Sequence, residues 1–278
     1  MNNAMTNFDE ILHLSKDYGL PQEKKRAILR EYLQTKILSL IYREGTSKNL
    51  FFVGGTALRI LHGLDRFSED LDFDSVGITP REIQKLVKTV MHGLDQENIA
   101  VELYQNTTQK KYYYELRFPY LLAQLKLSSN TGEKLMIKLD IESLWRGQKR
   151  EMVFLNRYGL LATIVTKSLD QMLVEKLAAY LGRKETQARD LYDLVWLLAR
   201  GMKIDRTFAQ KNHLTSDLLE KALKKFNREK KLLPIYKTKL HPFLFDERKT
   251  SSLDFFENLV KIPEKRYIQT RTNQTSSG

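Results

Sequence analysis

The sequence predicts an α+β fold in which a mixed β-sheet flanked by helices is followed by an all-helical C-terminal domain. Short apolar or alternating stretches, typical of strands, are confined to the first 160 residues, and helical spacing replaces them afterwards. The length of 278 residues agrees with two domains, since a domain averages roughly 150 residues. We expect these domains over residues 1–160 and 161–268, followed by a polar, disordered tail over residues 269–278.

The elements of the first domain follow from apolar spacing and from residues that begin or end helices. An amphipathic helix is expected over residues 22–44, then a strand over 50–53 and a short helix over 57–62. Thr79 and Glu82 have the spacing of a capping box, which begins a helix that runs to about residue 94. The remaining stretches predict strands over residues 71–74, 99–104, 111–118, 135–141 and 151–155.

The second domain contains only helical patterns. Ser168 and Gln171 repeat the capping-box spacing and begin a helix that runs to about residue 181. Further helices are expected over residues 187–200, 205–212, 216–230 and 252–260.

The composition excludes several classes of protein. Because the chain has no cysteine, it cannot form a disulfide scaffold, a thiolate zinc site, an iron–sulfur cluster or a cysteine nucleophile. No apolar run approaches the roughly 20 residues of a membrane span. The N-terminus is polar and mixed in charge, unlike a secretory signal. We therefore expect a cytoplasmic protein with no membrane partner.

The positive charge is concentrated near the C-terminus. The formal net charge is +12, and residues 202–278 alone hold 17 basic and 9 acidic side chains. This asymmetry favours a polyanionic partner bound through the last quarter of the chain. The alternative is a solvated helical surface.

Two aspartates on one predicted strand form the first candidate site. Asp70 and Asp72 are two residues apart, so both side chains point to the same face of the strand. Two neighbouring carboxylates repel each other unless a cation lies between them, and this donor type suits Mg²⁺. Asp74 continues the face and is expected to be a surface neighbour. The alternative is an exposed acidic strand face.

A glycine turn precedes these acids. Gly54, Gly55 and Thr56 lie between a predicted strand and a predicted helix. Glycines let the backbone approach a phosphate closely, and the N-terminus of a helix directs N–H groups at it. A phosphate-binding turn followed by a carboxylate pair is more informative than either feature alone.

Asp140 is a candidate third carboxylate. It lies between Leu139 and Ile141 on a predicted strand, and alternation places it near Lys138 and Glu142. If this strand neighbours the first, three acids can bind two metal ions, one activating an attacking hydroxyl and one holding a triphosphate. The alternative is a structural role.

The helical domain has an unusual lysine. Lys176 falls within an apolar helical stripe, so its ammonium either extends to solvent or meets a negative charge such as a phosphate. On the next helix, Arg189, Asp190 and Asp193 either form ordinary ion pairs, position Lys176 or touch a nucleotide.

Together these residues resemble the AbiEii family of nucleotidyltransferase toxins, within the polymerase-β-type nucleotidyltransferase superfamily. The first motif comprises Gly54-Gly55-Thr56, Leu58, Arg66, Ser68, Asp70, Leu71, Asp72 and Phe73. The second comprises Glu175-Lys176-Leu177, Ala179, Arg183, Arg189-Asp190 and Asp193-Leu194. Asp140 matches the third carboxylate of the superfamily. Where the superfamily often has serine, Thr56 keeps the hydroxyl but adds a methyl group that crowds the turn.

The resemblance implies a nucleotidyltransferase fold and Mg²⁺-dependent transfer of nucleotides from an NTP to RNA, at the acceptor end of tRNA, with a cognate antitoxin as partner. Asp70 and Asp72 would hold two Mg²⁺ ions, and Asp140 would join one of them and help to activate the acceptor hydroxyl. The implied nucleotide-binding residues are Gly54, Gly55, Thr56, Arg66, Ser68, Lys176, Asp190 and Asp193, with Arg66 and Ser68 either bracing the turn or touching phosphate.

A basic helix follows the region of resemblance. Lys221, Lys224, Lys225 and Arg228 recur at three- and four-residue spacing, which suits a phosphate backbone. Two alternatives stay open: nucleotide transfer to a small molecule or a protein hydroxyl, and a nucleic-acid-binding module without catalysis.

Overall fold

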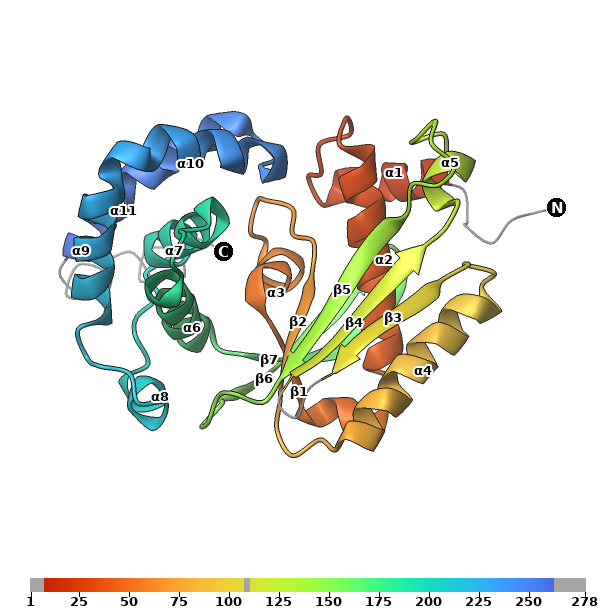
Figure 1. The fold of residues 1–278 in the computed structure, drawn as a ribbon, viewed down its shortest axis with the longest axis horizontal. Helices are drawn as coiled ribbons and strands as arrows, with labels where there is room; N and C mark the ends of the chain where they lie inside the picture. Colours follow the sequence, from red (N-terminus) through yellow and green to blue (C-terminus); the bar gives the residue numbers. More distant parts are fainter. Residues whose placement is uncertain (1–7, 108–110, 263–278) are drawn as a thin grey trace, which may run out of the picture. The chain divides into compact units, whose positions relative to one another are not determined.

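The computed structural model describes residues 8–107 and 111–262, which form two compact units (Figure 1). The first unit comprises the chain up to Trp145 together with residues 149–167; the second comprises residues 146–148 and the chain from Ser168 onward. This division falls later than the predicted boundary after residue 160, because residues 160–167 form a strand of the first unit. The predicted tail over residues 269–278 lies outside the described residues.

Within the described residues, the first unit contains a mixed seven-stranded sheet with the order β3-β4-β5-β2-β1-β7-β6. The strands are β1 Leu50–Val53, β2 Leu71–Ser75, β3 Glu102–Thr107, β4 Lys111–Phe118, β5 Leu135–Glu142, β6 Arg150–Arg157 and β7 Leu160–Lys167. β2 pairs with β5, and β1 with β7, in parallel, and the other pairs are antiparallel. The centre of the sheet therefore joins segments far apart in the sequence.

The helices of the first unit pack against the apolar face of this sheet or against one another. They are α1 Phe8–Asp17, α2 Lys25–Ile41, α3 Gly54–His62, α4 Pro80–Gln96 and the single turn α5 Leu121–Gln124, with the 3₁₀ helix η1 Gly45–Asn49. α2 packs against α4, β5 and β7. Leu71, Phe73 and Leu139 are fully or almost fully buried on this face, and the rings of Phe52 and Phe73 lie 5.4 Å apart.

Alternation along β2 and β5 directs polar side chains to the opposite face. Because apolar and acidic residues alternate along these strands, one face of the sheet packs against helices and the other carries the acids. Figure 1 shows β5, β4 and β3 side by side, with α4 running beside β3. The predicted capping box is confirmed, since Thr79 N donates to Glu82 Oε2 at 2.8 Å and Glu82 N donates to Thr79 Oγ1 at 3.3 Å.

The second unit is helical throughout its described residues. It contains α6 Leu169–Gly182, α7 Ala188–Ala199, α8 Arg206–Lys211, α9 Leu218–Glu229, α10 Leu233–Leu240 and α11 Phe256–Lys261, with the 3₁₀ helices η2 Lys230–Leu232, η3 His241–Phe243 and η4 Glu247–Phe255. The core includes Phe226 and Phe256, whose rings lie 5.0 Å apart. Across residues 8–107 and 111–262, no helix combines the length and apolarity needed to cross a membrane.

The sequence predictions missed α1, α5, β7 and α10. Residues 160–167 had no predicted element, although they pair with β1 through Thr166 opposite Phe52 and with all of β6. The hydroxyl of Thr166 donates to the carbonyl of Phe52 at 2.7 Å, which fixes β7 beside the glycine turn. The sheet of the first unit is therefore completed by β7, which pairs with β1 although the two strands are far apart in the sequence.

Candidate active site

The glycine turn begins α3 directly at the end of β1. Gly54 has φ +76°, a left-handed conformation that favours glycine, and the N-cap residue Val53 gives the helix no side-chain hydrogen bond. The first N–H groups of α3 therefore lack a side-chain cap and are suited to bind an anion. Because β1 and β2 are antiparallel with Val53 opposite Asp72, the turn lies beside that carboxylate. A Cβ atom on Gly54 would come within 2.2 Å of Asp72 Oδ2.

Arg66 and Ser68 lie behind the turn. A Cβ atom on Gly55 would come within 2.5 Å of Arg66 Nη2 and 3.1 Å of Ser68 Oγ. The Arg66 side chain is buried, and its Nη1 donates to the carbonyl of Phe67 at 2.9 Å. Arg66 and Ser68 were expected either to brace the turn or to touch phosphate, and these contacts agree with bracing.

Thr56 joins the turn to the start of β2. Its side chain is buried, and its hydroxyl donates to the backbone carbonyl of Asp70. The hydroxyl therefore serves the fold in this arrangement. In the predicted phosphate-binding turn, the N–H groups at the start of α3 are left as the donors for a phosphate.

Asp72 and Asp140 are brought together by strand pairing. They are direct register partners in the parallel pair β2–β5, although 67 residues lie between them in the sequence. Asp70 immediately precedes β2, two residues before Asp72. The polar face thus has Asp72 and Asp140 side by side at its centre, next to Gly54.

Asp140 has a cationic neighbour that the sequence analysis did not identify. Lys111 Nζ, on β4, lies 3.2 Å from Asp140 Oδ1 and 2.8 Å from Glu142 Oε1. Although partial burial lowers it, hydrogen bonds to Glu142 and Asp140 hold the pKa of Lys111 above its ordinary value. The lysine is therefore charged, and only the β4–β5 register, which the sequence did not fix, could have revealed the contact.

Asp74 is not the surface neighbour that was predicted. It is buried, and its Oδ2 lies 2.5 Å from Nζ of Lys167, which is itself fully buried at the end of β7. The prediction was wrong because it considered β2 alone, whereas Lys167 from β7, on the other side of β1, pairs with Asp74, and the Trp145 ring lies 5.6 Å from the Lys167 ammonium. Asp74 thus anchors the sheet.

The carboxylates of Asp70, Asp72 and Asp140 are the type of ligand that binds a hard divalent cation. Carboxylate oxygens are the ligands that Mg²⁺ takes, and here they come from adjacent strands, with the Gly54 backbone packed directly against the Asp72 carboxylate. Over residues 8–107 and 111–262, however, no three acidic or histidine side chains are gathered closely enough to hold a metal ion. Asp140 is paired with Lys111 instead.

In the helical unit, two acids hold Lys176. Its Nζ lies 2.8 Å from Asp193 Oδ2 and 3.5 Å from Asp190 Oδ1. Asp193 is fully buried, and Asp190 also pairs with Arg183 at 2.7 Å. These contacts agree with two of the interpretations left open, ordinary ion pairs and acids that position Lys176. Because the lysine side chain is only 14% exposed, its ammonium is not extended freely into solvent.

The basic helix α9 separates into an outer and an inner face. Lys221, Lys224 and Arg228 are exposed, and two of them are paired within the helix. Lys221 lies 3.0 Å from Asp217, and Lys224 lies 2.6 Å from Glu220. The exposed face is therefore less positive than its lysines alone imply.

Lys225 does not lie on that face, contrary to the prediction. It is buried and its Nζ donates to the carbonyls of Tyr180 and Arg183, at 2.6 Å and 2.9 Å, at the end of α6. These carbonyls have no partner within the helix, so the lysine caps α6. It falls beside Ala222 and Phe226 on the apolar stripe of α9, which is the signal that could have identified it.

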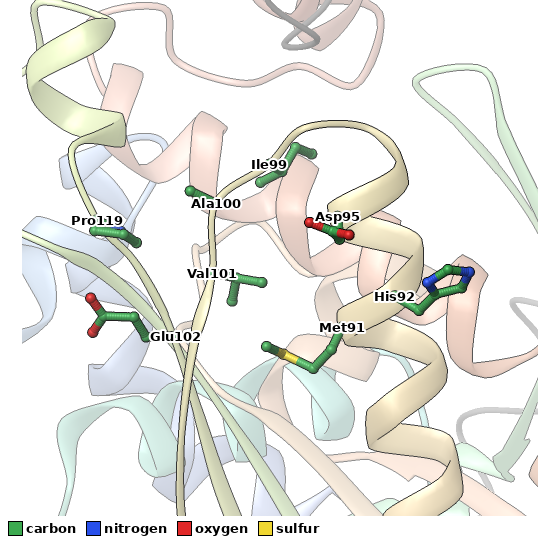
Figure 2. A pocket seen from close by; sticks show the side chains of 8 residues that line it. All are labelled: Met91, His92, Asp95, Ile99, Ala100, Val101, Glu102 and Pro119. Atoms are coloured by element: carbon green, nitrogen blue, oxygen red, sulfur yellow. The ribbon is translucent and has the colours of Figure 1, made fainter.

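A separate cavity lies between the C-terminal half of α4 and the start of β3 (Figure 2). Its lining mixes apolar side chains such as Met91 and Val101 with the acids Asp95 and Glu102. Glu102 lies opposite Arg117, near the C-terminal end of β4, whereas Asp140 lies opposite Tyr113, near the N-terminal end of the same strand. None of the predicted site residues lines this cavity, so it is not the candidate active site.

The fold and these two clusters define a nucleotidyltransferase-like protein, and comparison with known proteins gives the family. A family model described as "Nucleotidyl transferase AbiEii toxin, Type IV TA system" matches residues 36–267. The chain therefore belongs to the AbiEii family of nucleotidyltransferase toxins, and this toxin–antitoxin family implies an antitoxin partner. A search of curated protein sequences finds no significant match.

Solved structures share the fold at low sequence identity. JHP933 from Helicobacter pylori is 22% identical, with a TM-score of 0.52 over 89% of this chain and 97% of its own. A putative nucleotidyltransferase from H. pylori is 21% identical, with a TM-score of 0.56 over 88% of this chain and 97% of its own. MenT4, a nucleotidyltransferase toxin from Mycobacterium tuberculosis, is 20% identical, with a TM-score of 0.52 over 88% of each chain. These likenesses confirm the predicted fold class.

Proposed function

We propose that this toxin is a Mg²⁺-dependent nucleotidyltransferase that transfers nucleotides from an NTP to RNA, at the acceptor end of tRNA, and thereby blocks translation in the cytoplasm. The observation that carries the proposal is the juxtaposition of Gly54, Asp72 and Asp140. A phosphate-binding helix start adjoins one carboxylate, and strand pairing sets a second carboxylate beside it. This is the arrangement that nucleotidyl transfer needs around a triphosphate.

In the reaction, an acceptor hydroxyl attacks the α-phosphorus of the NTP. A new P–O ester forms, the bond to the β-phosphate breaks, pyrophosphate leaves, and the hydroxyl proton passes to a base or water. Asp70 and Asp72 would hold two Mg²⁺ ions, and Asp140 would join one of them by exchanging its contact with Lys111 for the metal, which requires the three acids to draw closer together than they lie here. Bound there, the ions would supply neutralisation of phosphate charge and a lower pKa for the attacking hydroxyl.

The other residues bind and orient. The N–H groups at the start of α3 hold phosphate oxygens, while Arg66 and Ser68 keep the turn in shape behind them. Lys176, already oriented by Asp190 and Asp193, supplies a fixed positive charge for the triphosphate. The exposed residues Lys221, Lys224 and Arg228 contact the RNA backbone. The family's toxin–antitoxin character and the basic last quarter of the chain support RNA as the acceptor.

The experiment that tests this proposal is transfer of label. The purified protein is incubated with total tRNA, Mg²⁺ and each α-labelled NTP in turn, and RNA is separated from protein. Label in tRNA, lost when Mg²⁺ is chelated, supports the proposal. Label in the protein fraction or in a small molecule would place the chain with transferases of another acceptor class. An absence of any transfer with every NTP would contradict it.

A further inference from the structure

A row of side chains crosses the polar face of the sheet from the candidate acids towards its β3 edge. Asp72 on β2 is the register partner of Asp140 on β5, and Asp140 is the register partner of Tyr113 on β4. Register partners share a face, so the three side chains follow one another across the strands. Lys138, two residues before Asp140, lies on the same face.

Lys138 is a cation with no acidic partner in the described part of the chain. Its register partner Glu115 is occupied by Arg117, whose Nε and Nη2 lie 3.0 Å and 2.6 Å from Glu115 Oε2. Among the described residues, no salt bridge forms to Lys138, and the side chain is half-buried. A partly desolvated ammonium of this kind is suited to bind an anion.

Tyr113 is half-buried and lies opposite Asp140 in the β4–β5 register. A tyrosine hydroxyl can donate one hydrogen bond and accept others. Tyr113 and Lys138 thus place a hydroxyl donor and a cation on the same side of Asp140.

The direction of the row decides which substrate these residues face. The triphosphate-binding turn lies on the β1 side of Asp72, because Gly54 follows β1 and packs on that carboxylate. In nucleotidyl transfer, the attacking oxygen approaches the phosphorus in line with, and opposite to, the leaving group. The acceptor must therefore reach the acids from the other side, which is the β4 side occupied by Tyr113 and Lys138.

We propose that Lys138 and Tyr113 form the acceptor-binding subsite, with the Lys138 ammonium on the phosphate of the terminal RNA nucleotide and the Tyr113 hydroxyl hydrogen-bonded to its ribose. This inference rests on the proposed function and extends it, since it names the surface that receives the acceptor. It also explains why the cation is left without an acidic partner on a face rich in carboxylates.

Steady-state kinetics with the RNA and the NTP varied separately test the subsite. Lys138→Ala and Tyr113→Phe should each raise the KM for RNA roughly tenfold, the effect of losing one polar contact to substrate, and leave the KM for NTP within about twofold. Lys138→Arg keeps the charge and should recover most of the loss. Lys88→Ala, an exposed lysine of α4, is the matched control and should behave as wild type.

Thermal unfolding of each variant separates a binding defect from a folding defect. If Lys138→Ala has wild-type stability and an unchanged KM for RNA, the proposed subsite is wrong. It is also wrong if the substitution raises the KM for NTP and leaves the KM for RNA unchanged. If wild-type protein labels no RNA at all, the proposed function fails, and the subsite fails with it. If wild type labels RNA and the variants match it, only the subsite is wrong.

Discussion

Replacing Gly54 with alanine isolates the contact between the glycine turn and the Asp72 carboxylate. The new Cβ would lie 2.2 Å from Asp72 Oδ2 and 2.9 Å from its Cγ, while real Cβ contacts stay beyond 3.0 Å. The carboxylate must therefore move by about 0.8 Å, the difference between 3.0 and 2.2. A misplacement of about 1 Å costs on the order of 100-fold in rate, so we expect kcat to fall by that factor.

The same substitution also strains the backbone, because φ at Gly54 is +76°. A left-handed alanine costs roughly 1–2 kcal/mol of stability. Gly63→Ala provides the matched control, since Gly63 has φ +77° but a Cβ there would meet no atom within 4 Å. Both variants should lose similar stability in urea, and only Gly54→Ala should lose transfer of labelled nucleotide. Equal loss of activity in both variants, or near wild-type activity in Gly54→Ala, would refute the reasoning.

Three further outcomes are expected. Lys225→Met leaves the two carbonyls at the end of α6 without a donor, so stability measured in urea should fall by about 3 kcal/mol while the KM for RNA is unchanged. Lys176→Ala should raise the KM for NTP or lower kcat by roughly 100-fold, and unchanged kinetics would show that the lysine only balances its acids. The triple change of Lys221, Lys224 and Arg228 to glutamate should raise the KM for RNA and flatten its dependence on salt, with the KM for NTP constant; a salt slope that survives would place the RNA surface elsewhere.

Local signals predicted most of the fold. The reciprocal hydrogen bonds of Thr79 and Glu82, and the hydroxyl of Ser168 accepting from Gln171 N, begin α4 and α6 where the sequence indicates, because helix starts depend on neighbouring residues. β7 was missed because its partners, β1 and β6, lie on different sides in the sheet and one of them is over 100 residues earlier. Pairing at that range leaves little trace in a local pattern.

The candidate site shows the same limit. Spacing alone put Asp70 and Asp72 on one face, but only the sheet could set Asp140 opposite Asp72 and Lys111 beside it. Spacing also misled on α9: Lys225 shares three- and four-residue intervals with exposed lysines and with the apolar stripe, so the interval cannot decide between them. The structure shows that Lys225 is buried, so this lysine, which was predicted to contact RNA, caps helix α6 instead.

The central claim is that this chain transfers the nucleotidyl group of an NTP through the site built around Asp72. Parallel reactions with α-labelled and γ-labelled NTP, using wild type and Asp72→Asn, test it most directly. We expect the α-label in RNA with wild type, the γ-label released as pyrophosphate and absent from RNA, and neither label transferred by Asp72→Asn of unchanged stability. Transfer of the γ-label, or transfer of the α-label by Asp72→Asn at the wild-type rate, would contradict the account.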